Sequence, residues 1–161
     1  MALKLGHAIW GFARIEWLSY RYVKSLSESD LNSLVDDFLS LTEAQGFSSR
    51  TKILKKLVKR SGADSALVEN AIQLLNKAMK LAEKRNIIVH NPWQIWIDLN
   101  KEEFVSEISH PLDSTAERLS EADIDQFAKD AEELERQLET ALSALTNASR
   151  TTRSKRRGPE A

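Results

Sequence analysis

The sequence predicts a mainly α-helical protein: an up-and-down helical bundle with a small β-hairpin after the fourth helix. Its 161 residues suffice for one domain with a genuine core. Only five Gly and three Pro residues are present, so long stretches contain no helix breaker. Apolar residues recur at spacings of three and four, which is the period of a helix with one buried face. Helices of this kind, joined by short loops, pack as a bundle.

Four helices are expected before the hairpin. The apolar pattern places them at residues 3–26, from residue 31 to a connection closed by Gly46, at 48–60, and from Asp64 or Ser65 to about His90. Asp64 or Ser65 can cap the fourth helix. This helix should end near His90, because Asn91 precedes Pro92 and proline disfavours the α conformation in the residue before it. The predicted buried residues of the first helix are Leu5, Ala8, Phe12, Ile15, Tyr22 and Leu26.

The second half of the chain combines a hairpin with one long helix. Two roughly alternating segments, 93–99 and 103–108, flank a polar turn and predict two antiparallel strands. The last helix should start at Ser120, whose spacing to Asp123 fits a capping box. Residues 1–146 are therefore expected to form a single helical domain. Residues 147–161 are rich in Ser, Thr, Arg and Lys with little apolar content, and we expect them to form a basic disordered tail.

Composition excludes several classes of site. The chain contains no cysteine, so disulfides, thiolate metal sites and cysteine nucleophiles are absent. The histidines at 7, 90 and 110 lack metal-ligand spacing, and there is no phosphate-binding glycine loop, so we expect neither a metal nor a cofactor. Arg14 and Glu16 interrupt the apolar stretch at the N-terminus, and no segment is long and apolar enough to span a bilayer. We therefore expect a cytoplasmic protein without membrane contact.

Charge is unevenly distributed although the formal net charge is only −1. Residues 50–60 carry six basic side chains and no acid, whereas acids dominate residues 117–139. The basic helix either follows an RNA backbone or is simply a solvated face, and no aromatic residues are interleaved to stack on bases. Its candidate RNA-binding residues are Lys52, Lys55, Lys56 and Lys59.

The most informative segment is Arg85–His90, at the end of the predicted fourth helix. Arg85 and Asn86 continue apolar rows of that helix, where the pattern asks for core residues. A buried guanidinium needs a partner or a cleft. His90 lies four residues after Asn86 and shares its face. A purely structural role is the alternative: Arg85 would pair with Glu16, and His90 would cap the last helix carbonyls. Glu16 is itself a partner of Arg85, a third catalytic group or a plain surface residue.

Arg85-Asn86-x-x-x-His90 resembles the R-(N/D/H)-x-x-x-H signature of HEPN domains, the nucleotide- and RNA-acting four-helix proteins of prokaryotic toxin–antitoxin and defence systems. Residues 82–84, which lead into the motif, and residues 91–93, which follow it, resemble the corresponding segments of family members. The resemblance covers residues 3–90 loosely and 81–93 well. Asn91-Pro92 departs from the glycine that follows the histidine in many members. The first helix is similar to the opening helix of these domains through Trp10, Phe12, Ile15 and Glu16.

The resemblance implies a metal-independent endoribonuclease, acting as a toxin or defence effector with RNA as substrate and an antitoxin as a partner. In such enzymes the ribose 2′-hydroxyl attacks the phosphate. His90 would be the general acid or base, Arg85 would stabilise the charge of the transition state, and Asn86 would orient His90 or contact phosphate. Products would end in 2′,3′-cyclic phosphate or 3′-phosphate. Two alternatives stay open: a non-catalytic HEPN-like module that binds RNA, nucleotide or protein, and a helical dimer in which Arg85 and His90 are structural.

The resemblance also implies a homodimer in which two motifs line one cleft. Trp10 and Trp17 lie on the side of the first helix opposite Phe12 and Ile15. Two tryptophans in that position need a cover, since large aromatic surfaces are favourable to bury. A second copy of the chain provides one such cover. The predicted hairpin or last helix provides another, and the sequence leaves both open.

Overall fold

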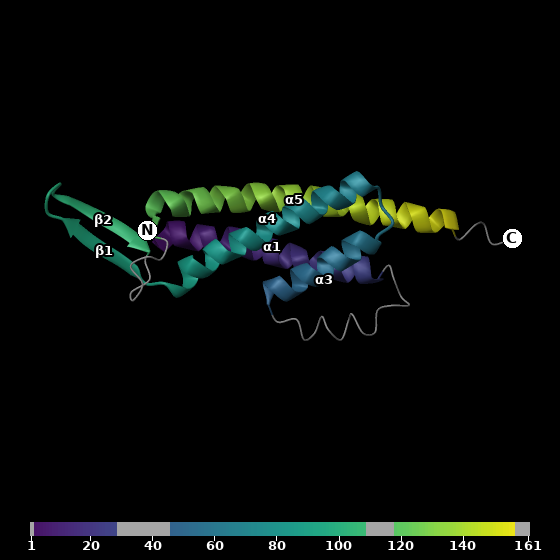
Figure 1. Cartoon of the computed structure of the whole chain (residues 1–161), viewed down its shortest axis with the longest axis horizontal. Coiled ribbons are helices and arrows are strands. Elements are labelled where there is room, and N and C mark those ends of the chain that lie inside the picture. The colour runs from purple at the N-terminus through teal and green to yellow at the C-terminus, as the bar shows by residue number, and fades with distance from the viewer. Residues whose placement is uncertain (1, 29–45, 109–117, 157–161) are drawn as a thin grey trace.

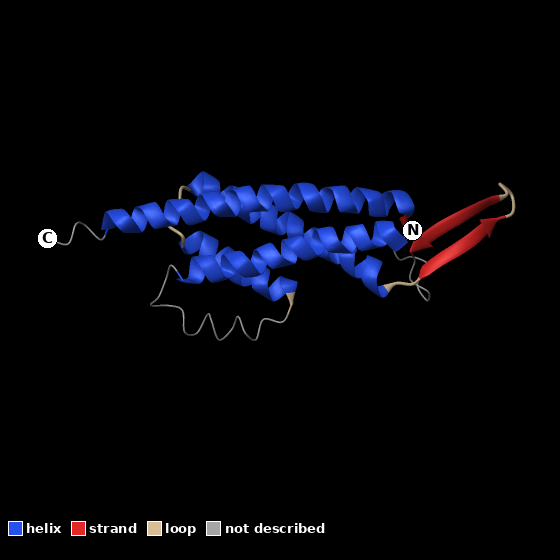
Figure 2. Cartoon of the chain, turned by 180° about the vertical axis from the view of Figure 1, so that it is seen from behind, coloured by secondary structure: helices blue, strands red, loops and turns tan. Residues whose placement is uncertain are grey.

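The computed structural model describes residues 2–28, 46–108 and 118–156. These residues form an elongated helical bundle from whose end a small sheet projects (Figures 1 and 2). The mainly helical fold with a hairpin is thereby confirmed, while the helix expected after residue 31 lies outside the described residues. The elements are α1 (Ala2–Glu28), α3 (Phe47–Arg60), α4 (Ser65–His90), β1 (Trp93–Asp98), β2 (Glu103–Ile108), β3 (Leu119–Ser120) and α5 (Glu121–Arg156).

The core lies where α1 meets α5 and α3, and α4 closes the bundle against α5 (Figure 1). Phe12 of α1 is buried at the centre, with its ring centroid 5.2 Å from that of Phe47 and 6.4 Å from that of Phe127. Gly11 lets the two long helices approach closely. A Cβ built at Gly11 would lie 3.3 Å from the Cβ of Ala131, so any larger side chain would separate α1 from α5.

Both ends of α4 are set by local chemistry, as the sequence predicts. The Asp64 side chain accepts a hydrogen bond of 2.8 Å from the backbone N–H of Ala66 at the N-cap. At the other end Asn91 is extended, which the following Pro92 requires, and its N–H still donates to the carbonyl of Ile87 at 3.1 Å. His90 is therefore the last helical residue.

α5 begins with the expected capping box. The Ser120 N–H donates to Asp123 Oδ2 at 2.8 Å, and the Asp123 N–H donates back to Ser120 Oγ at 3.2 Å. The helix continues to Arg156, so residues 147–156 are helical and not the disordered tail that composition predicted. The Ser149 hydroxyl contacts the carbonyls of Leu145 and Ser61. Serine content favours disorder when only composition is considered, but here the serine hydroxyl has hydrogen-bond partners within the fold.

β1 and β2 pair as an antiparallel hairpin, in register from Trp93 opposite Ile108 to Asp98 opposite Glu103. The short strand β3, which the sequence analysis did not predict, adds to β2 through Ile108. The base of the hairpin packs on the bundle, where Ile108 is buried.

The outer part of the hairpin leaves apolar side chains exposed. Ile97 and Phe104 are directly opposite each other, and both are exposed, as is Ile95 on the same face.

Among the described residues, no helix combines the length and the apolar character that crossing a bilayer requires.

Candidate functional site

Arg85 joins the end of α4 to α1. Its Nη2 lies 2.9 Å from Glu16 Oε1, and the two side chains are 27% and 25% exposed. The guanidinium carbon lies 5.4 Å from the centroid of the Phe12 ring, within the range of a cation–π contact. The pairing of Arg85 with Glu16, one of the alternatives from sequence, is thus present in the fold. Both groups keep contact with solvent, so the pair lies at the rim of the core.

Asn86 is exposed, and its predicted core position was wrong. The helical row that it continues contains Met79 and Ala82, which are themselves only partly buried. Asn86 therefore extends the border of the buried face and lies outside it. Its Oδ1 accepts a hydrogen bond of 3.1 Å from Arg85 Nη1. In this arrangement Asn86 orients the guanidinium.

His90 is exposed at the C-terminal end of α4, where the helix dipole favours a cation. Within the described part of the chain, no hydrogen bond joins His90 to Asn86 or to the last helix carbonyls. Its imidazole is accessible to a ligand from solvent. An imidazole can give or take a proton, and the guanidinium of Arg85, five residues earlier in α4, has further N–H donors for an anion. The site combines an open acid–base group with a cation held by an ion pair.

Comparison with family models, with curated proteins and with solved structures finds no match for this chain. The HEPN resemblance therefore depends on the Arg85–His90 motif and on the position of that motif at the end of a bundle helix.

In the described residues, no three His, Asp or Glu side chains gather as ligands for a metal ion.

The four candidate RNA-binding lysines of α3 divide into two groups. Lys52, Lys56 and Lys59 are exposed and follow one another at helical spacing on one face. Lys55 differs, because its Nζ donates to Asn76 Oδ1 of α4 at 2.7 Å. Three lysines thus form an open cationic face, which we call the α3 lysine face. Among the described residues, no ion pair joins this face to Arg85 or His90.

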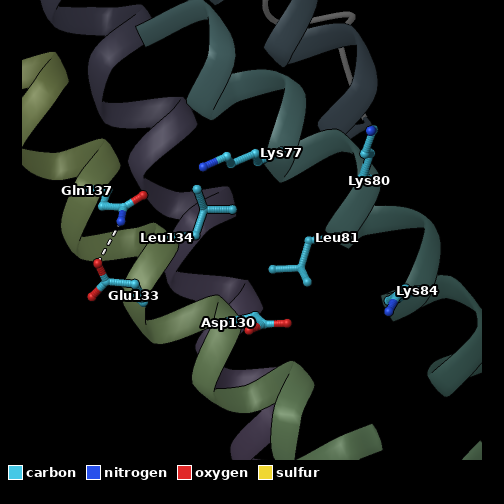
Figure 3. Close-up of a pocket in the computed structure, with 8 residues that line it drawn as sticks. All are labelled: Lys77, Lys80, Leu81, Lys84, Asp130, Glu133, Leu134 and Gln137. Carbon is cyan, nitrogen blue, oxygen red and sulfur yellow. Dashed lines mark hydrogen bonds between the residues drawn. The ribbon is translucent and has the colours of Figure 1, made fainter. Parts of the chain in front are cut away.

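A groove between α4 and α5, which sequence reasoning did not predict, has a volume of about 330 Å³. Lysines of α4 line one side, and Asp130 and Glu133 of α5 line the other (Figure 3). Glu133 already accepts hydrogen bonds from Arg136 and Gln137. Opposite charges face each other across this groove, which makes it a poor site for a polyanion. The lysines are Lys77, Lys80 and Lys84.

Proposed function

We propose that this protein is a metal-independent endoribonuclease of the HEPN type, in which His90 and Arg85 act on the RNA backbone. The observation that carries the proposal is the Arg85-Asn86-x-x-x-His90 motif at the C-terminal end of α4, with Arg85 oriented and His90 open to solvent. A toxin or defence role, with an antitoxin as partner, is part of the same proposal.

The proposed reaction is an internal transfer of the phosphodiester. His90 accepts the proton of the ribose 2′-hydroxyl, and the 2′-oxygen forms a bond to phosphorus while the bond to the 5′-oxygen breaks. The leaving 5′-oxygen takes a proton from an acid, either a second imidazole or water. The products are a 2′,3′-cyclic phosphate and a 5′-hydroxyl.

Arg85 would stabilise the negative charge that accumulates on the phosphate oxygens in the transition state. Two of its nitrogens already donate, one to Glu16 and one to Asn86. A guanidinium has five N–H groups, so donors remain for a phosphate. Glu16 and Asn86 then act as positioning residues, because they fix the plane of the guanidinium.

The test is cleavage of varied RNAs in EDTA by wild type, Arg85→Ala and His90→Ala, with the new ends mapped. Wild type is expected to cleave and leave cyclic-phosphate ends. The rate should fall at least 100-fold in both variants, in line with the usual contributions of acid–base catalysis for His90 and of electrostatic stabilisation for Arg85. Matched controls are His7→Ala and Arg136→Ala, whose side chains are exposed ion-pair partners on other parts of the bundle. New 3′-hydroxyl ends, or equal loss in the controls, contradicts the proposal.

The Arg85–Glu16 pair favours a second candidate, a non-catalytic module in which Arg85 supports the fold and the same surface binds RNA, nucleotide or protein. Cleavage assays at a temperature where the Arg85→Ala variant is folded separate the two. A purely structural Arg85 predicts that Arg85→Ala lowers the melting temperature while wild type cleaves no RNA. A catalytic Arg85 predicts that wild type cleaves RNA and that Arg85→Ala, although folded, does not.

A further inference from the structure

Three aromatic side chains form an exposed face along α1. Trp10 is 66% exposed, Trp17 57% and Tyr20 60%, so neither the hairpin nor α5, as far as the structure describes them, covers these rings. At 100° per residue the three lie within about 80° of one another around the helix axis, on the side away from Phe12 and the core. Large aromatic rings gathered on one open face indicate a surface that binds a ligand. We call these three residues the aromatic face of α1.

The Trp17 ring is anchored by Arg21, one helical turn further along α1. The guanidinium carbon of Arg21 lies 5.0 Å from the centroid of the Trp17 ring, which is a cation–π contact. Arg21 is itself fixed, because it donates to Glu139 of α5 and, at 2.8 Å, to the hydroxyl of the buried Tyr22. The ring therefore has a preset orientation while more than half of the residue stays exposed. A preset ring loses little conformational entropy when a flat ligand stacks on it.

Charge beside the aromatic face suits a ligand that carries anionic groups. Lys24 lies four residues after Tyr20 and is exposed on the same side of the helix. Within the described part of the chain, no acid forms an ion pair with Lys24. Glu16, one turn before Tyr20, is already paired with Arg85 at 2.9 Å. A row of rings that ends in a cation matches the flat bases and the phosphates of a nucleic-acid strand.

We infer that the aromatic face of α1 stacks the bases of a single-stranded RNA. Stacking needs the flat faces of the bases, which neighbouring base pairs cover in a duplex, so only unpaired bases can use this site. Trp10 and Trp17 are seven residues, about 10 Å, apart along the helix axis, so each ring receives a base of its own. Lys24 contacts a phosphate of the same strand.

The aromatic face borders the candidate catalytic site. Tyr20 lies one turn after Glu16 on the same side of α1, with their Cβ atoms about 6 Å apart. Glu16 holds Arg85, so a strand whose phosphate contacts Arg85 has its adjacent nucleotides within reach of Tyr20 and Trp17. The inference rests on the proposed function in one respect, namely that the strand held here is the one cleaved at His90. Binding itself requires no cleavage.

Stacking selects the form of the RNA and not its sequence, since every base has a flat face. We therefore expect this site to take unpaired segments of varied sequence. It adds a selectivity that the α3 lysine face does not supply, because charge contacts alone bind single strands and duplexes alike.

Binding of a strand that cannot be cleaved tests the inference apart from catalysis. The probe is a short mixed-sequence 2′-O-methyl RNA, which lacks the 2′-hydroxyl nucleophile, used as a single strand or annealed to its complement. The single strand should quench the tryptophan fluorescence of the full chain on binding, whereas the duplex should not. Equal quenching by the two forms overturns the inference.

A matched pair of variants isolates the ring at position 17. Trp17→Phe keeps an aromatic ring, whereas Trp17→Leu keeps only apolar bulk. Trp17→Leu should weaken binding of the single strand about tenfold and Trp17→Phe by much less, since one stacked base contributes a factor of roughly 5 to 150. The control, Ile97→Ala with Phe104→Ala, removes exposed apolar residues of the hairpin and should bind like wild type. Unchanged binding by Trp17→Leu, or an equal loss in the control, contradicts the stacking site.

Sedimentation equilibrium of the full chain checks that the aromatic face is open to a ligand. A dimer that dissociates when Trp10 and Trp17 are both replaced by alanine would mean that a second copy covers the rings, and it would overturn the inference. A monomer, or a dimer that these two substitutions leave intact, supports it.

Cleavage is a separate readout, so the two proposals fail separately. On unmodified RNA, Trp17→Leu should raise KM several-fold and leave kcat near that of wild type, because stacking holds the substrate and the transition state equally. A wild type that is quenched by the single strand but cleaves no RNA would refute the ribonuclease and leave the stacking site in place. A Trp17→Leu variant with the KM of wild type would refute the stacking site and leave the ribonuclease.

Discussion

Arg85 Nη2 contacts Glu16 Oε1 at 2.9 Å, across a separation of 69 residues in the sequence. The contact fixes the C-terminal end of α4 against the middle of α1. It places the guanidinium beside the aromatic ring of Phe12, at the border between the core and solvent. An arginine in this position contributes to the fold and can bind an anion at the same time, and the variants below separate these two roles.

The ion pair should contribute measurably to stability because both side chains are about three-quarters buried. We expect Arg85→Ala and Glu16→Ala each to lower the free energy of unfolding by roughly 1–2 kcal/mol, with a coupling energy of about 1 kcal/mol in a double-mutant cycle. Urea denaturation of the wild type, both single variants and the double variant measures these values. Purely additive effects would show that the contact contributes no stability of its own.

The capping box of α5 should make stability depend on pH in the acid range. Hydrogen bonds from the Ser120 hydroxyl and N–H lower the pKa of Asp123 below its ordinary value of 3.8. Because the pKa of Asp123 is lower in the folded state, the Asp123 carboxylate stabilises the fold in full at pH values above its ordinary pKa. This stabilisation is lost as the pH falls through the lower pKa of the folded state.

Asp123→Asn should therefore destabilise the protein at neutral pH, and the difference from wild type should shrink as both are acidified below about pH 4. Ser120→Ala should cost about 1 kcal/mol at neutral pH, the usual effect of losing an N-cap. Thermal melts across the acid range test both. A difference that stays constant down to the lowest pH would rule out the linkage.

The α3 lysine face should contribute to RNA affinity if RNA is the substrate. Replacing Lys52, Lys56 and Lys59 by alanine should weaken binding to single-stranded RNA and lower the slope of log affinity against log salt by about 2. The control replaces the three lysines of the α4–α5 groove, which changes the net charge equally. Equal effects in both triple variants would indicate only a general charge effect.

Gly11 and Gly6 should respond oppositely to added side chains. Gly11→Val should lower the free energy of unfolding by roughly 1–3 kcal/mol, because the new side chain would press α1 away from Ala131. Gly6→Ala should be neutral or stabilise the helix by up to about 1 kcal/mol, since nothing lies within 4 Å of the added Cβ. Chemical denaturation compares the two. Destabilisation by Gly6→Ala in a monomeric sample would contradict the geometry at α1.

Local chemistry let the sequence predict the element ends. The Asp64 cap, the Asn91-Pro92 stop and the Ser120–Asp123 box each act within a few residues, so their geometry follows from spacing alone. Apolar periodicity likewise predicted the buried face of α1. The same reasoning failed at Asn86, because periodicity gives a direction around the helix but not how far the neighbouring helices extend. Composition misled for residues 147–156, which are helical, with the Ser149 hydroxyl hydrogen-bonded to the distant Ser61 carbonyl.

The sequence by itself determined that the chain forms amphipathic helices with a hairpin, and that Arg85, Asn86 and His90 lie together at a helix end. Only the tertiary structure decided which of several partners Arg85 takes, because Glu16 is distant in sequence and its approach depends on how α1 and α4 cross. The same holds for Trp10 and Trp17. Their orientation follows from helical period, but their exposure depends on where every other element packs, and that is a property of the whole fold.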